Sequence, residues 1–229
     1  GETFTLDGSH TYSGTTTVTA GSLLLDGTLI GNPTVVAGYR ADFDPDTQPT
    51  NWQYLWNNGV LIGDAANYTA MLDAGTLWTG TGDTATADTD DGALRLTANG
   101  GTPGLAGTPT NDQFAIAAYT VTADGLYAIS DSFLTRGSTS GNGVSLRLFL
   151  NDSTTPFYSA TVTSNNTRIF DQSLGYLSAG DTIYFAVGPN GNNASDNFTW
   201  DFSIVTGSAS PGAITVESGA ALGGSGATN

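Results

Sequence analysis

Residues 198–205 read FTWDFSIV, and this stretch decides the fold class of the chain. Large apolar residues (Phe198, Trp200, Phe202 and Ile204) alternate with small or polar ones. Successive side chains of a β-strand point to opposite faces, so a period of two predicts a strand with one buried face. Residues 144–150, VSLRLFL, repeat the pattern. Such strands are typical of antiparallel sheets that pack on a core from one side.

Further strand-like stretches occur throughout the central part of the chain. They are residues 39–43, 52–56, 93–98, 113–122, 126–134, 157–163, 167–170 and 182–187. Only residues 65–72 indicate a helical turn. About ten strands in one domain predict two packed sheets with jelly-roll topology.

The composition narrows the function classes. The 229 residues contain no cysteine and no lysine, and the formal net charge is −16. This charge disfavours partners with phosphate backbones or anionic lipid surfaces, so we expect neither nucleic-acid binding nor membrane insertion. The absence of cysteine excludes disulfides and thiolate metal sites. No apolar run is long enough to span a membrane, and Gly1 in the first position indicates a processed or excised chain.

A short phrase recurs at both ends of the chain. Residues 17–21 read TVTAG, residues 34–38 read TVVAG and residues 215–219 read TVESG. The first two copies begin at residues 17 and 34, a spacing of about one coil of a β-solenoid. Short β-branched strands that end in glycine and recur at this spacing are typical of stacked parallel rungs. The alternative is chance similarity in a chain rich in threonine and glycine.

Together with residues 8–18, GSHTYSGTTTV, and 222–226, LGGSG, the phrase resembles the autotransporter-associated β-strand repeat. The resemblance implies a β-helical stalk on an exported bacterial surface protein. The pattern stops after Gly38 and resumes near Ser208. We therefore predict solenoid rungs in residues 1–38 and 206–229, with a sandwich inserted at residues 39–205. A few rungs cannot bury a core alone, so neighbouring repeats or copies of the chain itself are expected partners.

Within the insert, residues 39–57, 113–133 and 180–205 are similar to a sandwich domain of exported planctomycete and verrucomicrobial proteins. In outline, that domain resembles jelly-roll carbohydrate-binding modules. The resemblance implies an extracellular or cell-surface location and a polysaccharide or cell-surface glycan as partner. The complete fold prediction is an all-β chain, a jelly-roll β-sandwich inserted between rungs of a short β-solenoid.

No catalytic constellation emerges from the sequence. The single histidine, His10, lies in a Gly/Ser/Thr-rich phrase of the expected solenoid, and cysteine and lysine nucleophiles do not occur. Paired carboxylates for glycoside hydrolysis remain formally possible. Most aspartates, however, lie in turn phrases such as residues 88–92, where they usually bend the chain. We therefore expect a protein that is not an enzyme.

Aromatic residues are the candidates for glycan binding. Trp52, Tyr54 and Trp56 share one face of an expected strand, and such rings either stack on sugars or fill the core. Trp78 lies among turn residues and is expected to be the exposed ring, with Arg95 as a hydrogen-bond donor.

Structural calcium is the second candidate ligand. Asp88 and Asp90 precede Gly92 in an acidic loop. A second set takes aspartates from the two ends of the insert, because the ends of an inserted domain should lie close together. It comprises Asp42, Asp44, Asp196 and Asp201. The alternative for both sets is a group of solvated turns.

Two functions follow. The sandwich is either a carbohydrate-binding or adhesive module presented by the solenoid stalk, or the chain is a structural subunit of an extracellular filament, surface layer or matrix that stacks head to tail.

Overall fold

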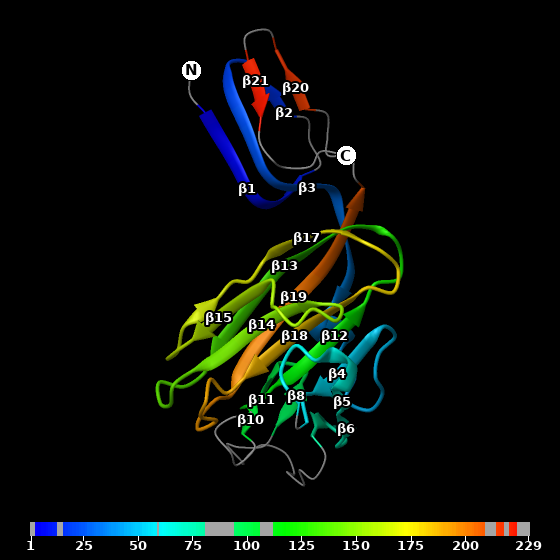
Figure 1. Cartoon of the computed structure of the whole chain (residues 1–229), viewed down its shortest axis with the longest axis vertical. Coiled ribbons are helices and arrows are strands. Elements are labelled where there is room, and N and C mark those ends of the chain that lie inside the picture. The colour runs from blue at the N-terminus through cyan, green and yellow to red at the C-terminus, as the bar shows by residue number, and fades with distance from the viewer. Residues whose placement is uncertain are drawn as a thin grey trace.

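The computed structural model describes residues 3–12, 16–58, 60–80, 94–105, 112–208, 214–217 and 220–223. It shows a sandwich of two β-sheets, from one end of which a smaller group of strands projects (Figure 1). The helical segments within these residues are one turn of α-helix, α1 (Tyr39–Asp42), and a 3-10 turn at Ala65–Asn67.

Each sheet collects strands from distant parts of the chain. Within the described residues, the larger sheet contains β1 (Thr3–Tyr12), β3 (Gly21–Gly38), β6 (Leu72–Asp73), β7 (Trp78–Thr79), β8 (Arg95–Thr97), β9 (Gly100–Thr102), β13 (Gly125–Arg136), β16 (Thr167–Arg168), β17 (Gln172–Leu177), β19 (Phe198–Ser208) and β21 (Ala220–Gly223). The smaller sheet has the order β15 (Tyr158–Val162), β14 (Val144–Leu150), β18 (Thr182–Gly188), β12 (Ala115–Thr120), β4 (Trp52–Trp56) and β5 (Thr69–Ala70). Two separate pairs join β10 (Gly104–Leu105) to β11 (Asp112–Gln113) and β2 (Thr16–Val18) to β20 (Ile214–Val216).

Strand β19, which contains residues 198–205, organises the larger sheet. It pairs antiparallel with β13 along one edge and with β3 and β9 along the other. In the smaller sheet, β18 lies between β12 and β14, although about thirty or more residues separate it from each. Strand neighbours that are distant in sequence are a feature of Greek-key and jelly-roll sandwiches. The prediction of an all-β sandwich is confirmed.

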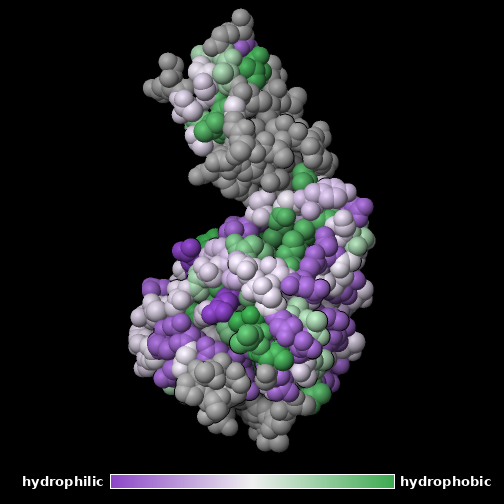
Figure 2. Space-filling model, in the orientation of Figure 1, coloured by the Kyte–Doolittle hydropathy of each residue, from purple (hydrophilic) through white to green (hydrophobic). Residues whose placement is uncertain are grey.

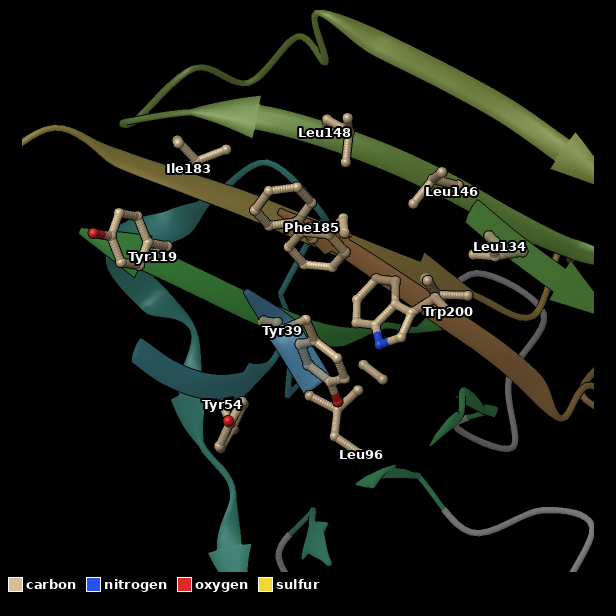
Figure 3. Close-up of a cluster of buried hydrophobic side chains, with 14 of the residues drawn as sticks. Tyr39, Tyr54, Leu96, Tyr119, Leu134, Leu146, Leu148, Ile183, Phe185 and Trp200 are labelled. Carbon is tan, nitrogen blue, oxygen red and sulfur yellow. The ribbon is translucent and has the colours of Figure 1, made fainter. Parts of the chain in front are cut away.

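The core lies between the two sheets and is rich in aromatic residues (Figure 3). The four apolar residues of the opening stretch are all buried, as their alternation predicts. Phe202 of β19 stacks on Phe185 of β18 with ring centroids 4.0 Å apart, and Trp200 packs edge-on against Tyr39. Aromatic pairs of this kind contribute energy beyond the area they bury.

The expectation of a strand at residues 39–43 is wrong, because this segment forms α1. The carboxylate of Asp42 accepts hydrogen bonds from the Gly38 backbone N–H (2.9 Å) and from Nε1 of Trp52 (3.1 Å). The chain turns here so that the Tyr39 ring enters the core. Tertiary packing therefore overrides a local strand-like pattern.

The strands of the projecting end pair in parallel. Strand β2 aligns with β20 so that Thr17 faces Thr215 and Val18 faces Val216, and β3 pairs in parallel with both β1 and β21. The first two residues of the first and third copies of the repeated phrase thus lie side by side. The second copy, residues 34–38, behaves differently, because it pairs antiparallel with β19 as part of the sandwich. Among the described residues, the parallel pairs of this end are β1–β3, β3–β21 and β2–β20, and they do not establish a solenoid, which remains a prediction.

The predicted domain boundary after residue 38 coincides with the end of β3, and the predicted boundary after residue 205 lies within β19. Strand β3 runs from the projecting end up to Gly38, and β19 runs from the sandwich to Ser208. On the face shown in Figure 2, hydrophilic residues cover much of the sandwich and are interrupted by smaller hydrophobic patches. No helix among the described residues is long and apolar enough to cross a bilayer.

Candidate functional site

A pocket of about 390 Å³ opens on the larger sheet, where β8, β9 and the start of β19 meet. Small-molecule sites typically have volumes of roughly 300–1,000 Å³. Most of its lining residues are Thr, Asn or Arg; the complete lining comprises Thr76, Leu77, Arg95, Thr97, Asn99, Gly101, Thr102, Asn197, Phe198 and Thr199. Asn99 and Thr199 are exposed and lie at its mouth, whereas Arg95 is buried.

Strand alternation explains which side chains reach this pocket. Leu96 of β8 is completely buried in the core, so its neighbours Arg95 and Thr97 point to the opposite face of the sheet. Arg95 pairs across the ladder with Thr102 of β9, which places both side chains on the same face. The Tyr39 hydroxyl donates to the Thr97 carbonyl at 2.7 Å and ties β8 to the core.

The guanidinium of Arg95 is held by neutral oxygens. Its Nε donates to Oγ1 of Thr102 at 3.2 Å, and an Nη donates to Oδ1 of Asn197 at 3.5 Å. The Thr102 hydroxyl in turn donates to the same Asn197 oxygen at 2.5 Å. Arg95 is only 8% exposed, and none of the ion pairs in the described part of the chain includes it.

The residue beside Asn197 belongs to a buried ion pair that fixes this part of the loop. Arg136 and Asp196 are both completely buried, with 3.0 Å between Nη2 and Oδ1. Arg136 also donates to the backbone carbonyls of Ser138 and Ser195, so it joins the loops that follow β13 and β18. Burial raises the pKa of Asp196 to about 6, although the guanidinium of Arg136 opposes the shift.

The aromatic candidates do not form an exposed platform. Trp52, Tyr54 and Trp56 of β4 are buried, which agrees with the alternative that they fill the core. The expectation that Trp78 is exposed is wrong, because its side chain is only 6% exposed. Its Nε1 donates to the Asp44 carbonyl at 2.9 Å, and its ring packs 5.4 Å from that of Tyr54. The residues around Trp78 predict a turn, yet the segment contributes strand β7 to the larger sheet.

The calcium candidates that lie within the described residues make contacts with other groups of the chain. Asp42 bonds to Gly38 and Trp52, Asp44 accepts from the backbone N–H groups of residues 46 and 47, and Asp201 faces Arg40 at 3.7 Å. No three acidic or histidine side chains gather as a metal site within the described ranges. Asp88 and Asp90 lie outside the described residues. Calcium binding itself stays a prediction.

Of the residues that sequence reasoning selected, Arg95 alone lines this pocket. The structure adds Asn197, Thr102 and Thr199 to it. No periodicity or motif could connect them, because about a hundred residues separate β8 from the start of β19. Asn99 is near Arg95 in the sequence, and the structure shows that both residues line the same cavity.

No protein-family model matches the chain, and no curated protein matches it either. Among solved structures, the chain is similar to the K3 cleaved adhesin domain of Lys-gingipain from Porphyromonas gingivalis w83. The identity is 9%, the match covers 77% of this chain and 99% of the adhesin domain, and the TM-score is 0.36.

A second similarity is to the C-terminal CBM6 of LamC from Zobellia galactanivorans, with 15% identity, 42% of this chain and 73% of that chain covered, and a TM-score of 0.25. A third is to a β-glucosidase from Kluyveromyces marxianus, with 12% identity, 79% of this chain but only 20% of the enzyme covered, and a TM-score of 0.30. Similarities at these TM-scores carry no argument about function. The resemblances to the autotransporter repeat and to exported sandwich domains therefore remain predictions.

Proposed function

We propose that this chain is a non-catalytic, extracellular carbohydrate-binding or adhesive module, and that it binds a glycan in the Arg95 pocket. The observation that carries the proposal is the pocket itself. It presents hydroxyl, amide and guanidinium groups within a cavity of about 390 Å³. Sugar hydroxyls both donate and accept hydrogen bonds, so a lining of Thr, Asn and Arg side chains suits them.

The proposed mode of binding differs from the aromatic stacking expected from the sequence. Because the aromatic rings of β4 and β7 are buried, recognition depends on polar contacts along β8, β9 and β19 rather than on stacking. Six of the ten lining residues belong to β8, β9 and β19, and strands of a packed sheet hold their side chains in defined positions.

The test is a binding panel of neutral and acidic polysaccharides against the full chain. Thr199→Trp places a large ring at the mouth of the pocket, and Thr163→Trp places the same ring on an exposed position outside the pocket lining. We expect Thr199→Trp to abolish binding and Thr163→Trp to preserve it. Binding that survives Thr199→Trp would remove the pocket from the proposal, and a panel without any ligand would overturn the function.

The second candidate is a structural subunit that assembles through the projecting end. Strands β1 and β21 flank β3 in a parallel ladder, and open strand edges favour pairing with another chain. Thr5→Pro removes a backbone N–H from β1 and should reduce assembly. Analytical ultracentrifugation across a concentration series tests this candidate, and a monomer at every concentration would exclude it.

A further inference from the structure

We infer that the Arg95 pocket selects a carbohydrate that carries an anionic group, a carboxylate or a sulfate ester, over its neutral counterpart. The inference rests on the proposed function and adds the chemical class of the ligand. It follows from the electrostatic state of one side chain, the guanidinium of Arg95.

Arg95 carries a buried charge that the described neighbours do not neutralise. Its hydrogen-bond partners among them, Thr102 and Asn197, are both uncharged. A guanidinium has five N–H donors, and these two contacts use two of them. A buried charge is costly unless it is paired, so the site favours an incoming negative group.

Arg136 shows how this fold treats an arginine whose role is structural. It is also buried, but a carboxylate from Asp196 lies 3.0 Å from it, and carbonyls of the adjacent loops accept its remaining protons. Arg95 differs in two respects, because it lines an open cavity and lacks such a carboxylate among the described residues.

The surroundings of Arg95 fit a sugar acid rather than a bare anion. A planar guanidinium matches the two oxygens of a carboxylate or sulfate. Around it, Thr97, Asn99 and Thr199 line the same pocket and offer partners for ring hydroxyls. The acidic group therefore meets Arg95 at the buried side, while the rest of the sugar contacts the polar mouth.

The net charge of −16 makes the salt dependence diagnostic. At low ionic strength, the whole protein repels an acidic oligosaccharide, and salt screens this long-range repulsion. The contact with Arg95 is buried and is screened much less. We therefore expect the affinity for the acidic ligand to rise as salt is increased from about 10 to 150 mM, where the Debye length falls from about 30 to 8 Å.

The experiment compares three oligosaccharides of equal length: a neutral galactan, a galacturonan and a sulfated galactan. Affinities for the full chain are measured by isothermal titration calorimetry. We expect at least one acidic ligand to bind roughly tenfold or more tightly than the galactan, since hydrogen bonds to charged groups are the stronger class. The two acidic ligands distinguish a carboxylate from a sulfate ester.

Variants then assign the selectivity to Arg95. Arg95→Gln should remove the preference for the acidic ligand, Arg95→Lys should restore part of it, and Arg168→Gln, at an exposed arginine outside the pocket, should leave it intact. Because Arg95 is buried and its loss could unfold the chain, Thr199→Asp provides a second test from an exposed position. It should weaken the acidic ligand far more than the galactan, whereas Thr199→Asn should not discriminate between them.

The outcomes separate the two proposals. Equal binding of all three oligosaccharides, or a preference unaffected by both Arg95→Gln and Thr199→Asp, overturns the anionic selectivity and leaves glycan binding in place. The anionic selectivity is also overturned if the affinity for the acidic ligand falls as salt is added, and falls equally for the wild type and for Arg95→Gln. No binding of any of the three, or of the wider panel, overturns the proposed function itself.

Discussion

Replacing Arg136 by methionine should destabilise the chain more than any other arginine substitution among the described residues. The Arg136 side chain is completely buried, and it donates twice to Asp196 and once each to the carbonyls of Ser138, Ser140 and Ser195. Methionine fills a similar space but leaves these oxygens without their donor. The loops after β13 and β18 also lose their common anchor.

The size of the expected loss of stability depends on the protonation state of Asp196, the partner of Arg136. Removing one member of a buried ion pair typically costs about 3–5 kcal/mol, because the other charge stays buried and unpaired. Asp196 already has a raised pKa of about 6, so protonation of its carboxyl limits the penalty. We therefore expect a loss of about 3 kcal/mol at pH 7, a large part of the stability of an ordinary domain.

Arg40→Met provides the matched control. Arg40 faces Asp201 at 3.7 Å, and the two side chains are 36% and 34% exposed. Pairs with this degree of exposure contribute about 0–1 kcal/mol. Urea unfolding at pH 7, followed by tryptophan fluorescence and far-UV circular dichroism, gives both free energies of unfolding. Equal losses for the two variants, or a loss below about 1 kcal/mol for Arg136→Met, would refute the reasoning.

Three further predictions concern pH, packing and fluorescence. Because the pKa of Asp196 is raised to about 6, its carboxyl binds a proton more tightly in the folded chain than in the unfolded chain. The stability that this proton binding contributes is full below about pH 4 and is lost as the pH rises through about 6. Relative to Asp196→Asn, the free energy of unfolding of the wild type should therefore fall by up to about 3 kcal/mol between pH 4 and pH 6, and a rise would contradict the assignment. Gly100→Ala should lower the free energy of unfolding in urea by about 2 kcal/mol or more, because the added Cβ would lie 2.0 Å from the Phe198 carbonyl oxygen. At Gly137 no atom lies within 4 Å of an added Cβ, so Gly137→Ala should change the free energy of unfolding by less than about 0.5 kcal/mol. Similar values for the two variants would show that the close approach at Gly100 is wrong. All four tryptophans are buried, so native fluorescence should be blue-shifted and resist acrylamide quenching, and ready quenching would contradict their burial.

Sequence periodicity located most of the sandwich because its strands have one apolar face. The expected strands at residues 52–56 and 144–150 coincide with β4 and β14, and residues 198–205 lie within β19. Strand β17 was missed, because QSLGYL contains glycine and serine and shows no clean alternation. Its existence depends on β13, whose open edge it pairs with, and a neighbour of that kind cannot be read from local sequence.

The candidate site was less accessible to sequence reasoning for a similar reason. The turn-like neighbours of Trp78 predict an exposed side chain, but pairing of β7 with β6 and β8 places the ring in the core. Conversely, Arg95 became significant only when β9 and β19 brought Thr102 and Asn197 beside it. The ion pair between Arg136 and Asp196 likewise joins residues that are far apart in the sequence, so local sequence does not predict it.

The pairing of β3 with both β1 and β21 has a mechanical consequence. A pull on the two ends of the chain acts on strands that are already joined through β3, so tension passes across that parallel ladder (Figure 1). The covalent route between the ends runs through the entire sandwich, but these hydrogen bonds bypass it. While this ladder holds, we therefore expect the sandwich and its Arg95 pocket to carry less of the load than the strands of the projecting end.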